Sequence, residues 1–302
     1  MKRVVSISIG SSKRDKSVEI ELLGERLLLE RIGTDGDLNK AAQLYKELDG
    51  KVDALGVGGG ILGFSVHGKD YPFHTFRRLT EAVTKTPVVD GTGLKLTLES
   101  RLASFIEAQI GEAIQPRRAL ITSAVDRYGM ALSFHQAQYD CIFGDLMFTF
   151  GIGIPIRRIR SFHILAALIL PIAGHLPIEW VYPTGEKQEI RTPKWGKYYQ
   201  WAKVIAGDCH MITHYMPDDL AGKIIVTNTT TPQDVALFRQ AGVRYLVTST
   251  PVLDGRSFGT NVMEGALVAI SGKGRPLTMQ EISNLLDALN MHPQLRDLSL
   301  TD

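Results

Sequence analysis

The stretch that decides the fold runs from Arg118 to Asp145 and reads RALITSAVDRYGMALSFHQAQYDCIFGD. An apolar run, 119–122, enters a short polar loop, 123–129. An amphipathic helix is expected next, and a second apolar run, 141–143, leads to Asp145. A strand, a loop, a helix and a second strand that ends on an acid are typical of a nucleotide-binding βαβ unit. In such a unit the helix N-terminus binds a pyrophosphate and the acid accepts the ribose hydroxyls.

The remainder of this half of the chain continues the alternation of strand and helix. Strands are expected at 118–122, 139–143, 203–206, 223–227 and 244–248. Such alternation predicts an α/β fold with a mostly parallel, Rossmann-like sheet. Residues 150–200, between the second and third strands, form a loop-rich insert that contains several prolines. A loop-rich insert of this length usually builds or covers a site.

The first 115 residues predict a second α/β domain. Its expected elements are strand 4–9, a hairpin over 18–32, helix 38–48 with Asp37 as N-cap, strand 52–57, a hairpin around 67–70, and helices 75–83 and 93–110 with strand 87–90 between them. Pro116 ends a helical pattern just before a new strand, which marks a boundary.

Three segments are therefore expected. Residues 1–115 form an N-terminal α/β domain that would carry substrate-binding and catalytic groups, and residues 116–272 form the nucleotide-binding domain. Residues 273–302 form an appended helical tail, in which Thr278 and Glu281 fit a capping box.

The composition is that of ordinary globular material, with 44% hydrophobic and 22% charged residues. A net charge of +2 gives no electrostatic argument for a nucleic-acid partner. Two cysteines and no signal-peptide pattern favour a cytoplasmic location. The longest apolar segment, 164–174, is shorter than the roughly 20 residues that span a bilayer, so no membrane partner is expected. It predicts a helix that is either buried within the monomer or part of a homodimer contact.

The polar loop after the first strand of this unit stands where a G-x-G-x-x-G motif is expected. If Gly129 is the third glycine, Ala124 and Asp126 take the other two places, and Ser123 opens the loop. The Asp126 carboxylate must then point away from a phosphate. Arg127 can pair with Asp126 or contact the phosphate itself. The alternative is an ordinary turn between a strand and a helix.

Asp145 indicates which cofactor the unit would take. An acid at the end of the second strand accepts the ribose hydroxyls and disfavours a 2′-phosphate. We therefore expect NAD, with NADP not excluded. The alternative is that Asp145 caps the following segment.

Small polar residues follow the later strands, at the edge of a parallel sheet where ligands bind. Asn228 and Thr229 follow one strand and Thr248 ends the next. Helix capping would explain the same residues. His210, after the third strand, is a candidate proton donor or acceptor. Although His214 is four residues further on, the two histidines have no convincing third ligand, so no metal site is expected.

Asp90 and Lys95 bracket a turn with two glycines that permit a ligand to approach closely. They are candidates for a proton-transfer pair.

Five further residues are candidates for substrate binding: Ser11, Ser12, Lys187, Arg256 and Asn261. The two serines end the first strand and could contribute to an anion nest. Arg256 is a candidate clamp for a carboxylate or phosphate. A solvated turn is the alternative for Lys187, and an N-cap is the alternative for Asn261.

Seven motifs together resemble a bacterial family commonly labelled quinate 5-dehydrogenase. They are GSSKRD (10–15), RIGTDGD (31–37), TPVVDGTGLK (86–95), SAVDRYGM (123–130), GDLMF (144–148), YPTGEKQ (182–188) and GRSFGTNVMEGAL (255–267). The resemblance runs over nearly the whole chain. It implies NAD(P)-linked oxidation of the C5 hydroxyl of quinate. The quinate/shikimate dehydrogenases use a catalytic Lys–Asp pair, for which Lys95 is the nearest match to the lysine and Asp90 is the expected partner.

The sequence thus predicts an NAD-linked oxidoreductase that acts on a small hydroxylated carboxylic acid, with Lys95 or His210 taking the hydroxyl proton. Two alternatives remain open. One is a non-catalytic nucleotide- or metabolite-binding protein with the same domains. The other is a transferase that uses a sugar nucleotide.

Overall fold

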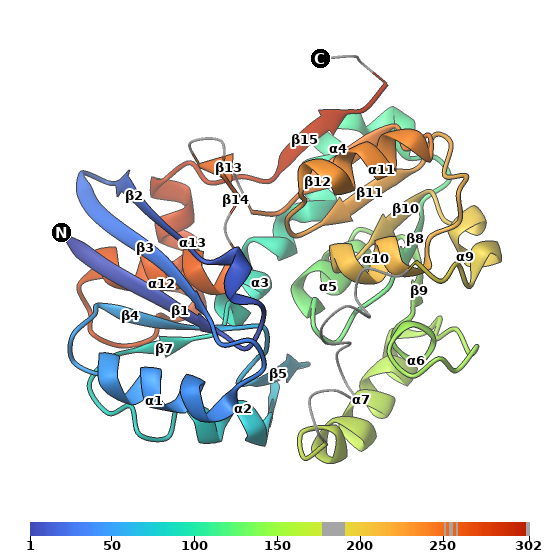
Figure 1. The fold of residues 1–302 in the computed structure, drawn as a ribbon. Coiled ribbons are helices and arrows are strands. Elements are labelled where there is room, and N and C mark those ends of the chain that lie inside the picture. Colours follow the sequence, from blue (N-terminus) through green and yellow to red (C-terminus); the bar gives the residue numbers. More distant parts are fainter. Residues whose placement is uncertain (177–190, 251, 254–255, 258, 300–302) are drawn as a thin grey trace. The chain divides into compact units, whose positions relative to one another are not determined.

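A computed structural model describes residues 1–176, 191–250, 252–253, 256–257 and 259–299, with only the backbone described for 252–253 and 256–257 (Figure 1). The chain divides into two compact units. Unit 1 comprises Met1–Leu94, Ile169–Gly185 and Gly259–Met291, and unit 2 comprises Lys95–Leu168, Glu186–Phe258 and His292–Asp302. This division falls after Leu94 and differs from the boundary expected near Pro116, because the helical segment before Pro116 packs with unit 2.

Unit 1 is built on a five-stranded sheet in the order β2-β3-β1-β4-β7 (Figure 1). The strands are β1 (Lys2–Ser8), β2 (Lys16–Leu22), β3 (Glu25–Gly33), β4 (Ala54–Gly58) and β7 (Val88–Val89). Strand β1 runs parallel to β3 and β4, and β2 and β3 form the predicted antiparallel hairpin. Unit 1 is therefore an α/β layer with a mostly parallel sheet.

The helices and the second hairpin of unit 1 match the sequence pattern in part, since the helix expected at 75–83 is shorter and residues 259–272 belong to this unit and not to the second domain. They are α1 (Leu38–Leu48), β5 (Gly63–Val66), β6 (Lys69–Pro72), α2 (His74–Leu79), α12 (Thr260–Ser271) and α13 (Met279–Ala288). The Asp37 carboxylate caps α1 by accepting a hydrogen bond from Lys40 N, as predicted. Thr278 and Glu281 form the predicted capping box of α13.

Unit 2 is built on a six-stranded sheet in the order β15-β12-β11-β10-β8-β9 (Figure 1). Its strands are β8 (Arg118–Ile121), β9 (Asp140–Phe143), β10 (Val204–Ala206), β11 (Ile224–Thr227), β12 (Tyr245–Thr248) and β15 (Gln294–Asp297). The first five are parallel, which confirms the predicted mostly parallel sheet. Because β8 lies between β9 and β10, the strand order reverses between β8 and β10. Ligands of doubly wound sheets bind at such a switch point.

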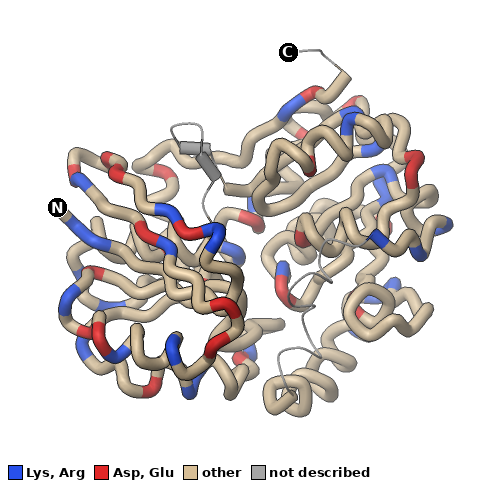
Figure 2. Tube along the Cα trace, viewed as in Figure 1, with Lys and Arg blue, Asp and Glu red and all other residues tan. Residues whose placement is uncertain are grey.

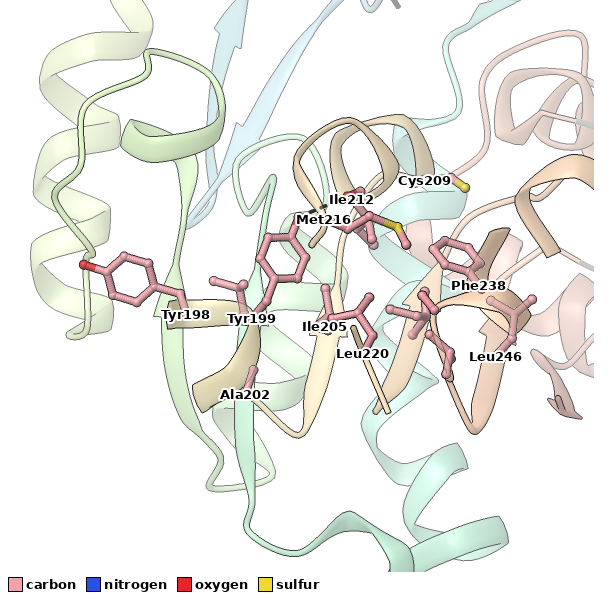
Figure 3. Packing of buried hydrophobic residues seen from close by; sticks show 14 of the residues in the cluster. Tyr198, Tyr199, Ala202, Ile205, Cys209, Ile212, Met216, Leu220, Phe238 and Leu246 are labelled. Carbon is pink, nitrogen blue, oxygen red and sulfur yellow. Dashed lines mark hydrogen bonds between the residues drawn. The ribbon is translucent and has the colours of Figure 1, made fainter. Parts of the chain in front are cut away.

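The core of unit 2 forms where helices cover the sheet. These helices are α5 (Tyr128–Gln136), α6 (Asp145–Phe148), α7 (Ile159–Ala173, which runs on into unit 1), α9 (Gly196–Trp201), α10 (Cys209–Tyr215) and α11 (Pro232–Gln240). Figure 3 shows buried side chains of β10 and β12 packed against those of α9, α10 and α11, including Tyr199, Ile212 and Phe238. Burial of each such side chain contributes roughly 1.5–3 kcal/mol. The Tyr199 hydroxyl donates to Ile212 O at 3.0 Å, so its polar atom is also satisfied.

The C-terminal segment differs from the expected appended helical tail, because its residues up to Met291 belong to unit 1 and those after it to unit 2. After α13 the chain forms β15, which adds to the sheet of unit 2 antiparallel to β12. A strand of four residues, none of which is buried, has no clear sequence signature, so the pattern does not predict it.

Most of the apolar segment 164–174 lies in helix α7, which is only partly buried within the monomer. One face is buried through Phe162, Ala166 and Leu170, whereas Ile164 and Leu168 are 61% and 64% exposed. A homodimer contact on the exposed face stays a prediction. None of the described helices is long and apolar enough to cross a membrane.

The helix expected over 93–110 is divided into α3 (Thr92–Thr97), the 3-10 helix η2 (Glu99–Arg101) and α4 (Leu102–Ile110), and the 3-10 helix η3 (Gly111–Ile114) follows. Helix α5 packs against η2 and α4. The approach is so close that a Cβ on Gly129 would lie 2.2 Å from Lys95 O and 3.0 Å from Leu96 Cα. Gly129 is therefore required by packing.

We predict that Gly129→Ala destabilises the protein by about 1–3 kcal/mol, because the added methyl group meets backbone atoms that cannot move independently. Urea unfolding followed by circular dichroism measures the difference. Gly111→Ala is the matched control, since a Cβ there meets no atom within 4 Å. Equal stability of the two variants would contradict the packing argument.

Candidate functional site

Five ionisable side chains of unit 2 form a group that we call the carboxyl-edge cluster: Lys95, Glu99, Asp126, Arg127 and Asp208. Lys95 lies on α3 and Glu99 on η2, whereas Asp126 and Arg127 lie between β8 and α5. Asp208 follows β10 and is the N-cap of α10. The cluster thus lies at the carboxyl ends of β8 and β10, which is the switch point of the sheet.

Arg127 is the centre of this cluster. Its Nη1 donates to Glu99 Oε1 at 2.5 Å and its Nη2 donates to Asp208 Oδ2 at 3.0 Å. Its Nε lies 3.6 Å from Asp126 Oδ2, and its side chain is only 4% exposed. Nη1 and Nη2 are thereby bonded to the protein's own carboxylates. Of the two roles expected for Arg127, the structure shows the pairing with Asp126, and contact with a cofactor phosphate stays a prediction.

The charges in the cluster change the ionisation of its members. Burial by itself lowers the pKa of the Arg127 guanidinium, but the carboxylates of Glu99, Asp126 and Asp208 outweigh it and raise that pKa, so Arg127 stays charged. Burial raises the pKa of the Glu99 carboxyl, although Arg127 and Lys95 act in the opposite direction.

Elsewhere, as Figure 2 shows, basic and acidic residues are interleaved along the chain.

Lys95 and Asp126 form the second ion pair of the cluster. Lys95 Nζ lies 2.7 Å from Asp126 Oδ1, and the two side chains are 8% and 13% exposed. Lys95 therefore belongs to a Lys–Asp pair, but its partner is Asp126. The Asp90 carboxylate instead accepts hydrogen bonds from Leu62 N and Thr92 N within unit 1, so the predicted pairing of Asp90 with Lys95 is corrected.

Further polar groups at the strand ends hold the cluster in place. Asp208 N donates to Ser123 Oγ at 3.1 Å, and Asn228 Nδ2 donates to Asp208 Oδ2 at 3.1 Å. Ser249, after β12, donates through Oγ to Glu99 Oε1 at 3.3 Å. Thr229 and Thr248 lie half-buried at the same strand ends. Ser123 and Asn228 thus lie at the same edge of the sheet, where both form hydrogen bonds with Asp208.

The loop predicted to cradle a pyrophosphate does not fit one in that way. Ala124 is fully buried, and the start of α5 is packed against the backbone at Lys95. The Asp145 carboxylate, predicted to bind a ribose, accepts a hydrogen bond from Val125 N at 2.9 Å. Burial raises the pKa of Asp145 to about 7, against backbone N–H groups that lower it. An acid committed to the loop amide is not positioned as the ribose acceptor, so that prediction is corrected.

The candidates in unit 1 have structural partners. Ser11 Oγ accepts from Lys13 N, and Ser12 N donates to the Asp35 carboxylate at 2.7 Å. The amide predicted for an anion nest is therefore occupied by the protein's own carboxylate. Asn261 Nδ2 donates to Ser6 Oγ at 2.6 Å and so joins α12 to β1.

Of the three other candidates, the structure describes the side chain of His210, which lies outside the carboxyl-edge cluster. His210 is exposed on α10, where its backbone N donates to the capping Asp208 carboxylate at 3.0 Å. Arg256 lies in β14 (Arg256–Ser257), which pairs with β13 (Val252–Leu253), and Lys187 lies outside the described residues. Among the described residues, no group of three or more His, Cys, Asp or Glu side chains is arranged to hold a metal ion.

Glu99 and Ser249 are two residues of this region that the sequence did not reveal. Glu99 stands four residues after Lys95, so a helical pattern places both on one face. That spacing was the available signal. The break of the helix into α3 and η2, and the partnership with Arg127, are tertiary features.

Comparisons with known proteins place the chain in a family without assigning it a role. The family described as "Domain of unknown function (DUF8754)" matches residues 93–298, and "Domain of unknown function (DUF8753)" matches residues 3–90. No curated protein matches the sequence.

Several solved structures are distantly similar. The NAD-dependent malic enzyme of Thermotoga maritima is 13% identical, with 94% of this chain and 75% of that chain covered and a TM-score of 0.39. A galactofuranose binding protein is 11% identical, with 99% and 95% covered and a TM-score of 0.39. A sugar ABC transport substrate-binding protein of Bordetella parapertussis 12822 is 10% identical, with 100% and 90% covered and a TM-score of 0.39. Likenesses this low carry no argument about function.

We predict that Arg127→Met destabilises the protein by about 3–5 kcal/mol, because it leaves Glu99 and Asp208 without their buried counter-charge. Replacing Glu99 by Leu in the same chain recovers part of the loss. Chemical unfolding of the single and double variants measures both effects. Arg157→Met is the control: its ion pair with Asp140 is 3.8 Å long and both side chains are about half exposed, so a change below about 1 kcal/mol is expected.

Asp145→Asn is expected to change how stability depends on pH. The ordinary pKa of 3.8 is raised to about 7 in the fold, so the stability that protonated Asp145 contributes is lost as the pH rises from about 4 to about 7. An asparagine still accepts from Val125 N and does not ionise. The variant should therefore gain stability relative to wild type over this range, by roughly 1–3 kcal/mol, and the gain should level off above it. Unfolding free energies measured from pH 5 to 8 check this; a pH-independent difference would contradict it.

Proposed function

Since the chain belongs to the DUF8754 family of domains of unknown function, we propose a function from the geometry of unit 2 itself. We infer that unit 2 binds a small hydroxylated carboxylic acid at the carboxyl-edge cluster and moves a proton to or from it with Lys95 and Asp126. The single observation that carries this proposal is the buried Lys95–Asp126 ion pair at the switch point.

The chemistry of the pair supports this role. A lysine ammonium has three N–H donors, of which one is directed at Asp126 Oδ1. In the direction that forms an alcohol, the ammonium donates a proton to the carbonyl oxygen. In the reverse direction, the neutral amine takes the hydroxyl proton. The Asp126 carboxylate holds Nζ in position through this hydrogen bond.

The resemblance to quinate 5-dehydrogenases implies that this proton transfer accompanies the oxidation of a secondary alcohol, with NAD or NADP as hydride acceptor. A Lys–Asp pair supports that reading. The loop from Ser123 to Gly129 does not, because its groups are already bonded within the protein. The dinucleotide would therefore have to bind without the expected phosphate-binding loop. The roles proposed here for residues of this chain are to bind the substrate acid and to transfer its proton.

A second candidate function is favoured by that same committed loop. A protein that binds a small metabolite without turning it over needs no dinucleotide cradle. It would bind the metabolite with the polar residues at the strand ends, including Asn228, Thr229 and Thr248. The carboxyl-edge cluster would then hold these strand ends in place without taking part in a reaction. The two candidates differ in what the loss of Lys95 does.

We predict that Lys95→Ala lowers turnover of quinate or shikimate with NAD⁺ or NADP⁺ by about 10²–10⁴-fold, the usual contribution of a positioned acid or base. Reduced cofactor measured by its absorbance gives turnover, and calorimetry gives binding of each acid and each dinucleotide. Asp126→Asn should lower turnover as well, because it removes the partner of Lys95.

Lys197→Ala is the control, since Lys197 is exposed on α9 and lies over the Tyr198 ring. Binding of an acid without turnover by the wild-type chain would favour the metabolite-binding function. Full turnover by Lys95→Ala would exclude the proton-transfer role.

A further inference from the structure

Asp145 has a position that the ribose-binding interpretation does not explain. It is the first residue of α6, and its Oδ1 accepts a hydrogen bond from Val125 N, 20 residues earlier in the chain. Its other oxygen, Oδ2, is buried and has no hydrogen-bond partner among the described residues. A buried carboxyl held by one backbone amide is retained at a cost, because its second oxygen is desolvated without compensation.

The amide that Asp145 holds belongs to the loop that carries the site. Val125 is followed directly by Asp126, which pairs with Lys95, and by Arg127, which pairs with Glu99. The start of the loop is fixed separately, since Ser123 Oγ accepts from Asp208 N and Ser123 O accepts from Arg127 N. Asp145 therefore fixes the middle of the loop, immediately before the proton-transfer pair.

We propose that Asp145 is a positioning residue for the Lys95–Asp126 pair, and that the protonation of Asp145 regulates the placement of that pair. This inference rests on the proposed function for its consequence in turnover. The contact itself can be tested without any substrate.

The groups that face Asp145 act in opposite directions on its ionisation. Across the loop, the Asp126 carboxylate opposes ionisation of Asp145, whereas the backbone N–H groups of Val125 and Ala124 favour it. The residues that follow it on α6, Leu146 to Phe148, are apolar, and Gly144 packs against Phe148 and Ile121 O. Burial is the largest effect and, together with the Asp126 charge, raises the pKa of Asp145 to about 7, so its charge changes near neutral pH. Because coupling is reciprocal, a change in the charge of either carboxyl is felt by the other.

The test follows the Val125 amide and the Lys95 side-chain signals of the isotope-labelled full-length protein by NMR from pH 5 to 9. We expect both signals to titrate with one shared midpoint near pH 7. Asp145→Asn should abolish that shared titration. Asp126→Asn should move the Val125 midpoint to lower pH, because it removes the charge that opposes ionisation of Asp145.

Asp219→Asn is the matched control, since Asp219 is an exposed carboxylate of unit 2 that also accepts one backbone N–H, from Ala221. It should leave both signals unchanged. A Val125 amide that does not titrate, or one that titrates while Lys95 does not follow, would overturn the proposal. An unshifted midpoint in Asp126→Asn would overturn it as well, and this variant leaves Asp145 in place if Asp145→Asn fails to fold.

Turnover separates this inference from the proposed function. If wild-type protein converts no acid, the proposed function fails, and the shared titration still supports the positioning role. If turnover is found, kcat/KM should show an ionisation near pH 7 that Asp145→Asn lacks. Turnover with an unchanged pH profile in that variant would remove Asp145 from the site while leaving Lys95 and Asp126 in their roles.

Discussion

The burial of one guanidinium is the interaction on which unit 2 depends. Arg127 is 4% exposed, and a charge so far from water is tolerated only where carboxylates and good hydrogen-bond geometry replace its hydration. Its partners come from η2, from the residue before it in the loop, and from the turn after β10. One side chain therefore holds three segments that are distant in sequence. Loss of Arg127 leaves its carboxylate partners without their buried counter-charge.

This constraint explains why the loop after β8 can lack the glycines of a phosphate-binding turn. In the usual motif, glycines let backbone amides approach a ligand closely. Here the same positions contain Ala124 and Asp126, and side-chain contacts hold the loop. Gly129 remains necessary because the backbone at Lys95 passes too close for a Cβ. The loop has the shape of a βα turn but its polar groups bind the protein itself.

The sequence predicted those parts of the fold that depend on local pattern. Short apolar runs predict all five parallel strands of unit 2, and the capping residues Asp37 and Thr278 mark two helix starts. It did not predict β15, because four half-exposed residues carry little hydrophobic signal. It also does not separate α3 from η2, against which α5 packs.

The same distinction applies to the candidate site. Residue type identified Lys95, Asp126 and Arg127, because charged residues beside an apolar strand are conspicuous in a sequence. Nearness in the chain predicts Asp90 as the partner of Lys95, and it does not indicate Glu99 as a partner of Arg127. The sheet order, in which β8 lies beside β10, brings Asp208 next to Arg127 across 81 residues. Sequence reasoning without that order cannot supply such pairs.

The charge balance of the cluster bears on how it could receive a ligand. Two cations, Lys95 and Arg127, face three carboxylates, those of Glu99, Asp126 and Asp208. With all five ionised, the cluster would carry one excess negative charge in a mostly buried setting, which would repel a substrate carboxylate. Burial raises the pKa of the Glu99 carboxyl, which opposes this excess, whereas Arg127 and Lys95 act in the other direction. Because Arg127 is committed to its own partners, a carboxylated ligand would be attracted chiefly by Lys95. The residue that attracts the ligand would then also transfer the proton, which requires that Lys95 be held firmly by Asp126.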